Sequence, residues 1–201
     1  MKRIGIFGGS FNPIHLGHTA LAAYICEQGL VDEVWLMVSP QNPLKRDLAL
    51  LDENERLAMA RLAVAPYPTL QACDFEFTLP RPSYTYHTLQ ALREAYPDYE
   101  FSLIIGEDNW QCFDHWYRGE DIARETPIIV YPRSAGHSEV SEYSVKQERI
   151  SILRSPPLLP YSSTEIRERI AAGHDASHML HPDVARYIKE KQYYVPKTNE
   201  A

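Results

Sequence analysis

The sequence has few cysteines, no long apolar run and no excess of positive charge. Its three cysteines, Cys26, Cys73 and Cys112, are scattered along the chain without the spacing of metal ligands. This usage is typical of a reducing compartment rather than of a disulfide framework. No apolar segment approaches the roughly 20 residues that span a bilayer, and the N-terminal apolar stretch is too short for a signal peptide. We therefore expect a cytoplasmic protein.

Positive charge is outnumbered, with 20 Lys and Arg against 27 Asp and Glu and a formal net charge of -7. The negative electrostatic field of such a protein disfavours binding to long nucleic acids and anionic membranes. Any phosphate-bearing partner must therefore be bound by a few local contacts. We expect small-molecule partners, no nucleic acid and no membrane. The 201 residues, 44% of them hydrophobic, suffice for one globular domain.

Short apolar runs alternate with helical patterns, which predicts βαβ units and a parallel sheet covered on both faces. The expected strands are 3–7, 33–38, 70–75, 101–106, 127–131 and 150–153. The expected helices are 18–28, 53–65, 84–95, 163–172 and 183–191. The predicted fold class is α/β, a Rossmann-like doubly wound parallel sheet. We expect one domain over 1–201, with 161–195 as a small C-terminal helical segment.

The stretch "GIFGGSFNPIHLGH" places Gly8, Gly9 and Ser10 directly after the first expected strand. Open parallel sheets bind phosphates at this position, where glycines admit an anion and the next helix adds its dipole. Glycines also form tight turns that hold no ligand. The pattern is neither G-x-G-x-x-G nor the Walker loop, which counts against a dehydrogenase and an ordinary P-loop NTPase.

Two histidines, His15 and His18, follow this turn, with Gly17 between them. Each imidazole can donate a hydrogen bond to phosphate or carry positive charge as negative charge develops. A lone histidine is more often a helix cap or a core residue, but two in this setting favour a phosphate site. No acidic or cysteine partner has zinc-ligand spacing nearby, so we expect no metal bound by the protein itself.

A second candidate anion site is "YSSTEIRERI" at 161–170. Ser162 or Ser163 can cap a helix, Glu165 completes a capping box around Ser162, and Arg167 then lies in the first turns. Amides, hydroxyls and a guanidinium would converge there to suit a triphosphate. The same residues would equally make an ordinary helix start followed by a surface arginine.

The stretch "GGSFNPIHLGH" resembles the nucleotidylyltransferase superfamily signature, and "SSTEIR" resembles its S-S-T-x-I-R element. Within that superfamily the chain resembles bacterial nicotinate-nucleotide adenylyltransferases over nearly its whole length. The matching stretches include "SPQNPLKR" (39–46), "SYTYHTL" (83–89), "IIGEDNWQCFDHWYRGEDI" (104–122) and "HPDVARYIKEKQYY" (181–194). Leu44 and His87 depart from the pattern, because the family often has His and Asp there.

The resemblance implies adenylyl transfer from ATP to nicotinate mononucleotide, giving deamido-NAD and pyrophosphate, with Mg²⁺ bound mainly through the ATP phosphates. The implied catalytic residues are His15, His18, Lys45 and Arg167. The residues expected to bind ATP are Gly8, Gly9, Ser10, Phe11, His15, His18, Ile105, Gly106, Asp108, Ser162, Ser163, Thr164 and Arg167. Those expected to bind the mononucleotide are Ser10, Asn12, Lys45, Thr85, Trp116, Tyr117 and Arg133.

Several alternatives stay open from sequence. Trp116 could stack on the nicotinate ring or belong to a core cluster with Trp110, Phe113 and Tyr117. Asp108 could bind ribose hydroxyls or orient Mg²⁺, or it could cap a helix. The chain could act on nicotinamide mononucleotide or phosphopantetheine, or be a non-catalytic nucleotide-binding regulator. A homo-oligomer fits the family, but no apolar stripe locates an interface.

Overall fold

The computed structural model describes residues 1–40, 50–132, 149–154 and 156–196. The predictions for Leu44, Lys45 and Arg133 concern residues outside these ranges. The described strands pair in parallel in the order β3-β2-β1-β4-β5-β6, which confirms the predicted doubly wound sheet. They are β1 (Lys2–Gly9), β2 (Glu33–Val38), β3 (Leu70–Cys73), β4 (Tyr99–Gly106), β5 (Ile128–Tyr131) and β6 (Ile150–Ile152).

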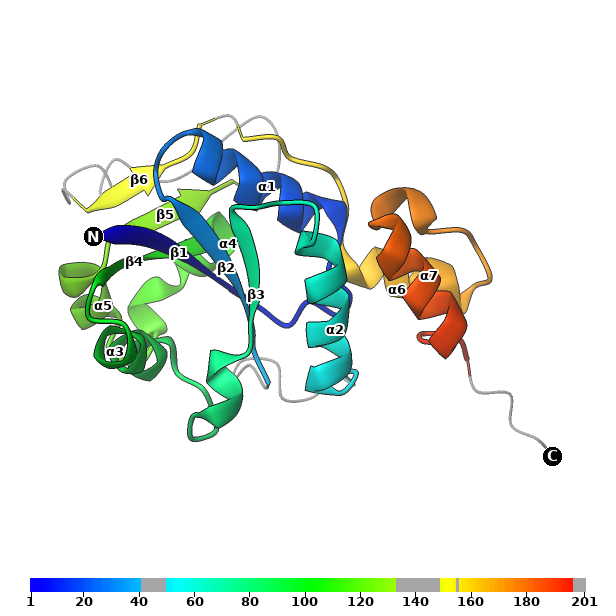
Figure 1. The fold of residues 1–201 in the computed structure, drawn as a ribbon, viewed down its shortest axis with the longest axis horizontal. Helices are drawn as coiled ribbons and strands as arrows, with labels where there is room; N and C mark the ends of the chain where they lie inside the picture. The colour runs from blue at the N-terminus through cyan, green and yellow to red at the C-terminus, as the bar shows by residue number, and fades with distance from the viewer. Residues whose placement is uncertain (41–49, 133–148, 155, 197–201) are drawn as a thin grey trace.

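Helices cover both faces of this sheet (Figure 1). One face packs against α1 (Leu16–Glu27) and α2 (Glu53–Val64). The other packs against α3 (Thr85–Ala95), α4 (Glu107–Gln111) and α5 (Gly119–Glu125). Short 3₁₀ turns occur at Phe75–Thr78, Phe113–His115 and Ser177–Met179. Successive side chains of the strands enter opposite cores, because a strand alternates its side chains between faces.

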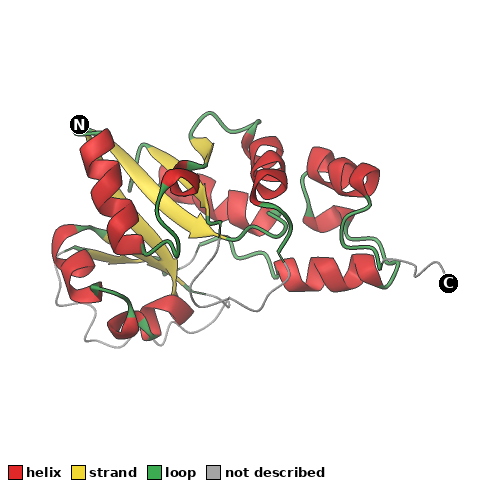
Figure 2. Ribbon diagram, turned by 90° about the horizontal axis from the view of Figure 1, so that it is seen from below, coloured by secondary structure: helices red, strands yellow, loops and turns green. Residues whose placement is uncertain are grey.

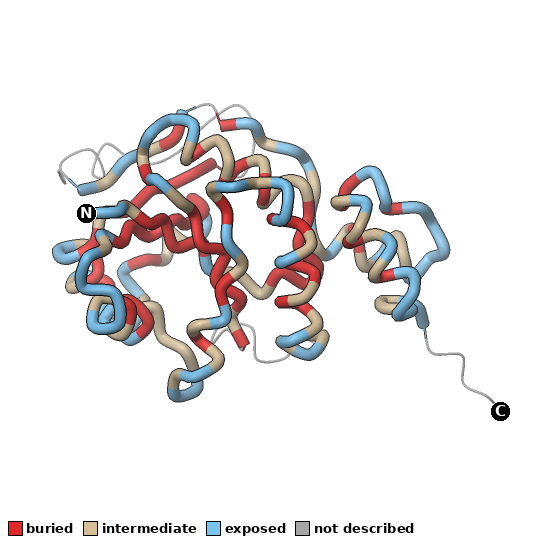
Figure 3. The backbone as a smooth tube through the Cα atoms, viewed as in Figure 1, coloured by how far each residue is buried: buried red, intermediate tan, exposed pale blue. Residues whose placement is uncertain are grey.

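The chain ends in two helices, α6 (Ser163–Ala171) and α7 (Pro182–Lys191), which lie at the end of the molecule away from the N-terminus (Figures 1 and 2). Ile166, Val184 and Ile188 are buried in the same apolar core as α1 and α2. Exposed positions dominate the outer side of this part, while the buried residues concentrate in the sheet and under α1 and α2 (Figure 3). Within the described ranges, no helix combines the length and apolarity needed to cross a membrane.

Several expected boundaries were wrong, and one matters for the site. Gly8 and Gly9 are the last residues of β1, paired with Met37 and Val38, so the turn begins at Ser10. The first helix begins two residues earlier than expected, at Leu16, with the preceding histidine at its N-cap. The third strand is shorter than expected, and the short helices α4 and α5 were not predicted.

Candidate active site

A cavity of about 670 Å³ opens at the carboxyl edge of the sheet. The chain leaves β1 towards β2 on one side and returns to β4 on the other, and open α/β sheets bind ligands at such a switch. All the predicted site residues that the structure describes line this cavity: Gly8, Gly9, Ser10, Phe11, Asn12, His15, His18, Thr85, Ile105, Gly106, Asp108, Trp116, Tyr117, Ser162, Ser163, Thr164 and Arg167. His115, to which the sequence analysis assigned no role, lines it too.

The two glycines at the end of β1 serve different purposes. A Cβ on Gly9 would lie 3.0 Å from the Phe11 ring, so its glycine makes room for an aromatic side chain rather than for an anion. A Cβ on Gly8 would meet no described atom within 4 Å, so that position is open towards the cavity. Phe11 itself is buried and has a φ of 44°, a left-handed backbone that non-glycine residues seldom adopt.

His15 and His18 form a stacked pair at the start of α1, with ring centroids 3.7 Å apart. Gly17 allows this packing, because a Cβ there would lie 3.0 Å from the His15 ring. The His18 Nδ1 accepts a hydrogen bond from the backbone N–H of His15, at 3.2 Å. A neutral imidazole that accepts at Nδ1 carries its proton on Nε2 and can donate there. The His18 ring also packs edge-on against Phe11, at 5.0 Å, which fixes its plane.

The C-terminal motif meets the turn after β1. Arg167 donates to the carbonyl oxygen of Asn12 at 2.8 Å, and the Ser163 hydroxyl donates to that of Pro13 at 2.8 Å. The Ser162 hydroxyl caps α6 by accepting from the backbone N–H of Glu165, as expected. Guanidinium, hydroxyls and the N-terminus of α6 therefore face the same cavity as the histidine pair.

Asn12 is held on more than one side. Its Oδ1 accepts from the Tyr194 hydroxyl at 2.9 Å and from the backbone N–H of Leu51 at 3.4 Å. Only 2% of Asn12 is exposed, so its side chain serves first to fix the turn. Burial raises the pKa of Tyr194, which keeps its hydroxyl protonated as a donor. Sequence reasoning missed Tyr194, which lies just before the terminal stretch.

Of the alternative core cluster, Trp110, Phe113 and Trp116 do pack together, whereas Tyr117 belongs to a different aromatic group. Trp116 packs on Phe113, at 5.2 Å between ring centroids, and lines the cavity. Tyr117, 49% exposed, packs on Tyr84 and His87 of the α3 start, at 5.0 and 5.3 Å. The Trp116 Nε1 is buried and makes no hydrogen bond to the described residues, which suits an edge that a polar ligand or water completes.

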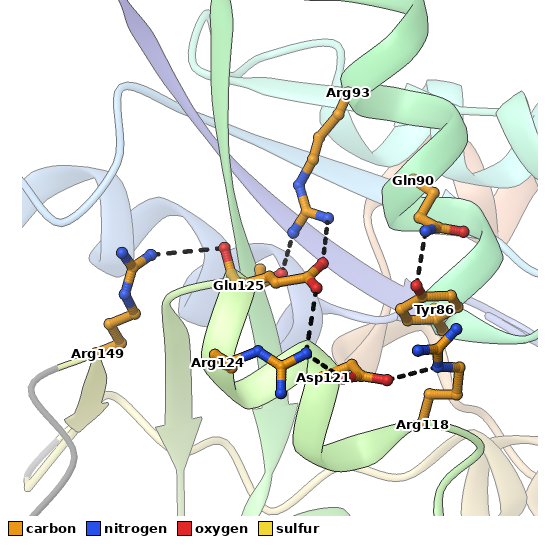
Figure 4. Close-up of polar contacts among 9 residues, drawn as sticks. Tyr86, Gln90, Arg93, Arg118, Asp121, Arg124, Glu125 and Arg149 are labelled. Atoms are coloured by element: carbon orange, nitrogen blue, oxygen red, sulfur yellow. Dashed lines mark hydrogen bonds and ion pairs between the residues drawn. The ribbon is translucent and has the colours of Figure 1, made fainter.

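A polar clamp, made of Arg118, Asp121, Arg93 and Glu125, holds α5 against α3 (Figure 4). Arg118 lies over the Tyr86 ring at 4.5 Å and donates to Asp121 at 2.5 Å. Arg93 of α3 pairs with Glu125 of α5 at 3.4 Å. Because Arg118 directly follows Tyr117, and Tyr86 directly follows Thr85, the clamp fixes the two segments predicted to hold the mononucleotide.

Glu76 is a further acidic group on the cavity wall that we had not predicted. It is 7% exposed and accepts a hydrogen bond from the Thr88 hydroxyl at 2.8 Å. Burial raises the pKa of this carboxyl, and the hydrogen bond from Thr88 opposes that rise. An acid placed between two phenylalanines, Phe75 and Phe77, is the signal that could have found it.

The described part of the chain has no group of three or more His, Cys, Asp or Glu placed to hold a metal ion. Asp108, in the first turn of α4, presents an exposed carboxylate at the cavity. It does not cap that helix, since Gly106 is the N-cap. A Mg²⁺ ion carried by a nucleotide triphosphate needs one or two carboxylates rather than a protein cage, and this arrangement fits such an ion.

Comparison with known proteins finds sequence relatives over nearly the whole chain. Residues 6–169 match the family model described as cytidylyltransferase-like. A curated Bacteroides thetaiotaomicron protein named "Probable nicotinate-nucleotide adenylyltransferase" is 48% identical over 94% of this chain and 91% of its own. A Flavobacterium psychrophilum protein of the same name is 40% identical over 96% and 98% of the two chains.

Solved structures agree on the fold. The Plasmodium falciparum nicotinic acid mononucleotide adenylyltransferase complexed with NaAD has a TM-score of 0.80 at 24% identity, covering 96% of this chain and 98% of that one. The same enzyme complexed with APC has a TM-score of 0.78 at 23% identity and the same coverage. From its sequence relatives, this chain belongs to the nicotinate-nucleotide adenylyltransferase family.

Proposed function

We propose that this protein transfers the adenylyl group of ATP to nicotinate mononucleotide, giving deamido-NAD and pyrophosphate, a step of NAD biosynthesis. The observation that supports it best is the meeting of the histidine pair and Arg167 at one cavity. A triphosphate lying there would be reached from two distant parts of the chain. The relatives' names point to the same substrate.

The reaction needs no protein nucleophile. An oxygen of the mononucleotide 5′-phosphate attacks the α-phosphorus of ATP, and the bond from that phosphorus to the bridging oxygen breaks. Pyrophosphate leaves with the electron pair. The protein has to align two anions that repel each other and stabilise the charge that develops on the α-phosphate and the leaving group.

The residues divide between these tasks. His18 donates from Nε2 to the phosphate, His15 supports it by stacking, and Arg167 with the α6 start holds the triphosphate. Lys45 is assigned to the same phosphates from the sequence resemblance alone. Ile105, Gly106 and Asp108, at the end of β4, form the adenylate side of the cavity. Mg²⁺, when bound with ATP, would neutralise phosphate charge beside Asp108.

The mononucleotide would occupy the side of the cavity between α3 and the 113–117 segment. The Trp116 face suits a flat pyridinium ring, and backbone N–H groups near Thr85 and Tyr117 would donate to its carboxylate. Arg133 is assigned to this substrate from resemblance and lies outside the described residues. A cytoplasmic location and the absence of nucleic-acid and membrane partners remain predictions from composition.

The test is pyrophosphate release from ATP and Mg²⁺ with nicotinate and nicotinamide mononucleotides side by side. We expect kcat/KM to favour nicotinate mononucleotide, because backbone donors recognise a carboxylate and leave an amide partly unpaired. A preference for nicotinamide mononucleotide, or for phosphopantetheine as a third acceptor, would identify a different adenylyltransferase. ATP binding without pyrophosphate release from any acceptor would identify a non-catalytic regulator.

A further inference from the structure

Arg56 is the most deeply buried charged side chain among the described residues, at 1% exposed, and no role has so far been given to it. It lies in the first turn of α2 and reaches the carboxyl edge of the sheet. Its guanidinium donates to the carbonyl oxygens of Ser10 (2.5 Å), Ser39 (2.9 Å), Pro40 (3.2 Å) and Leu51 (2.9 Å).

These four oxygens come from three separate stretches that meet at the cavity. Ser10 begins the turn after β1, Ser39 and Pro40 follow β2, and Leu51 precedes α2. Ser10 and Ser39 themselves line the cavity, so the guanidinium lies directly behind its wall. One side chain therefore ties the turn that begins at Ser10 to the end of β2 and to the start of α2.

The hydrogen bond to Ser10 also sets the direction of a peptide group. In a trans peptide the N–H points opposite to the carbonyl. Because the Ser10 carbonyl points to Arg56, the Phe11 N–H points away from it. Arg167, from the other end of the sequence, donates to the carbonyl oxygen two residues further on, that of Asn12. The guanidinium groups of Arg56 and Arg167 together fix the orientation of the peptide groups in this turn.

Among the described residues, the positive charge of Arg56 is compensated only by carboxylates that lie beyond ion-pair distance. No carboxylate of the described residues lies within ion-pair distance; Asp52 and Glu53 act on it from further away. Burying a guanidinium without a carboxylate partner is costly, and carbonyl hydrogen bonds offset only part of that cost. An apolar residue would fill the space with no such penalty, which indicates a use for the charge.

We propose that Arg56 is a positioning residue of the nucleotide site, which orients the Ser10–Phe11 peptide and places a buried positive charge behind the bound phosphates. The proposal rests on the proposed function, since it assumes that phosphates occupy this cavity. Its partner would be the polyphosphate of the nucleotide rather than the base or the sugar.

The experiment compares Arg56→Met and Arg56→Lys with wild type by calorimetry, using inorganic tripolyphosphate and adenosine as separate probes. Arg61→Met is the matched control, because Arg61 lies on the same helix, is 62% exposed and pairs with Asp74. We expect Arg56→Met to weaken tripolyphosphate binding by about tenfold or more, with adenosine affinity unchanged. Arg56→Lys keeps the charge and should fall between wild type and Arg56→Met, while Arg61→Met should bind both probes normally.

Circular dichroism and thermal unfolding establish that each variant is folded. Tripolyphosphate affinity within about threefold of wild type in folded Arg56→Met, or equal losses for both probes, would overturn the proposal. If Arg56→Met does not fold, Arg56→Lys decides: weaker tripolyphosphate binding with normal adenosine binding supports the role, and normal binding of both refutes it. Failure of wild type to bind tripolyphosphate or ATP would instead count against the proposed function.

Discussion

His18 is the single residue with the clearest chemical assignment, because its Nδ1 is used within the protein and Nε2 is set to donate. We expect His18→Ala to lower kcat by about 10²-fold or more, the size of effect seen when one donor to a transition state is lost. His174→Ala is the control, since His174 is exposed and outside the cavity lining. Unchanged turnover in folded His18→Ala would remove the histidine from the mechanism.

Trp116 tests the placement of the mononucleotide. Trp116→Ala should raise KM for the mononucleotide more than KM for ATP, because stacking acts on one substrate only. Trp116→Phe keeps an aromatic face, so its KM for the mononucleotide should lie much closer to the wild-type value. This variant separates the effect of stacking from that of the buried Nε1–H. Equal changes in both KM values after Trp116→Ala would argue that the residue is a core residue only.

Single residues differed in how far sequence could predict them. His15, His18 and Arg167 stand in short motifs whose spacing is informative, and the structure brings them to one cavity. Arg56 was missed because most of its partners lie in segments distant in sequence, whereas Glu76 had a local signal, its place between two phenylalanines, that the sequence analysis did not use. Asn12 was assigned to a substrate from the resemblance, and the structure adds that its side chain holds the turn through contacts with residues distant in sequence.

At the scale of elements, α2 and α7 are joined by a hydrogen bond from the Tyr187 hydroxyl to Glu55, at 2.6 Å. The bond lowers the pKa of Glu55 and raises that of Tyr187. Its stabilisation is therefore present above the unfolded pKa of Glu and below that of Tyr, and is lost as acid protonates Glu55 or alkali ionises Tyr187. The bond should matter most between about pH 5 and 9.

Tyr187→Phe should consequently lower the free energy of unfolding by on the order of 1 kcal/mol at pH 7, and by less at pH 3.5. Urea unfolding at the two pH values measures this difference. Glu55→Gln, alone and combined with Tyr187→Phe, completes a double-mutant cycle that isolates the contact. If Tyr187→Phe lowers the free energy of unfolding by the same amount at both pH values, the hydroxyl contributes to stability without the Glu55 charge.

The long elements were predictable and the short ones were not. Strands buried on both faces and amphipathic helices have patterns that local sequence carries. By contrast, α4 and α5 are one or two turns long, and the N-cap of α5 is Arg118, which has a left-handed backbone and makes no side-chain capping hydrogen bond. Gly8 and Gly9 were placed in the turn because glycine typifies turns, but ladder pairing with β2 keeps both in the strand.

At the scale of the whole molecule, the order of the strands in the sheet determines where the cavity lies. The crossover from β3 back to β4 opens the cavity beside β1, and α6 returns the chain to the same edge. The parallel sheet was predictable from alternating patterns, whereas the contact between Arg167 and Asn12 depends on how the last helices dock. Only the resemblance, and not any local pattern, placed the two motifs together.

The claim on which the rest depends is that α6, the first of the two helices near the C-terminus, takes part in binding the triphosphate. The most direct measurement is kcat/KM for ATP in Arg167→Met against Arg169→Met, two residues along the same helix, whose side chain donates to Asp175 instead. We expect Arg167→Met to lose about 10²-fold and Arg169→Met to stay within about threefold of wild type. If folded Arg167→Met turns over as fast as Arg169→Met, the two ends of the chain do not share one nucleotide site.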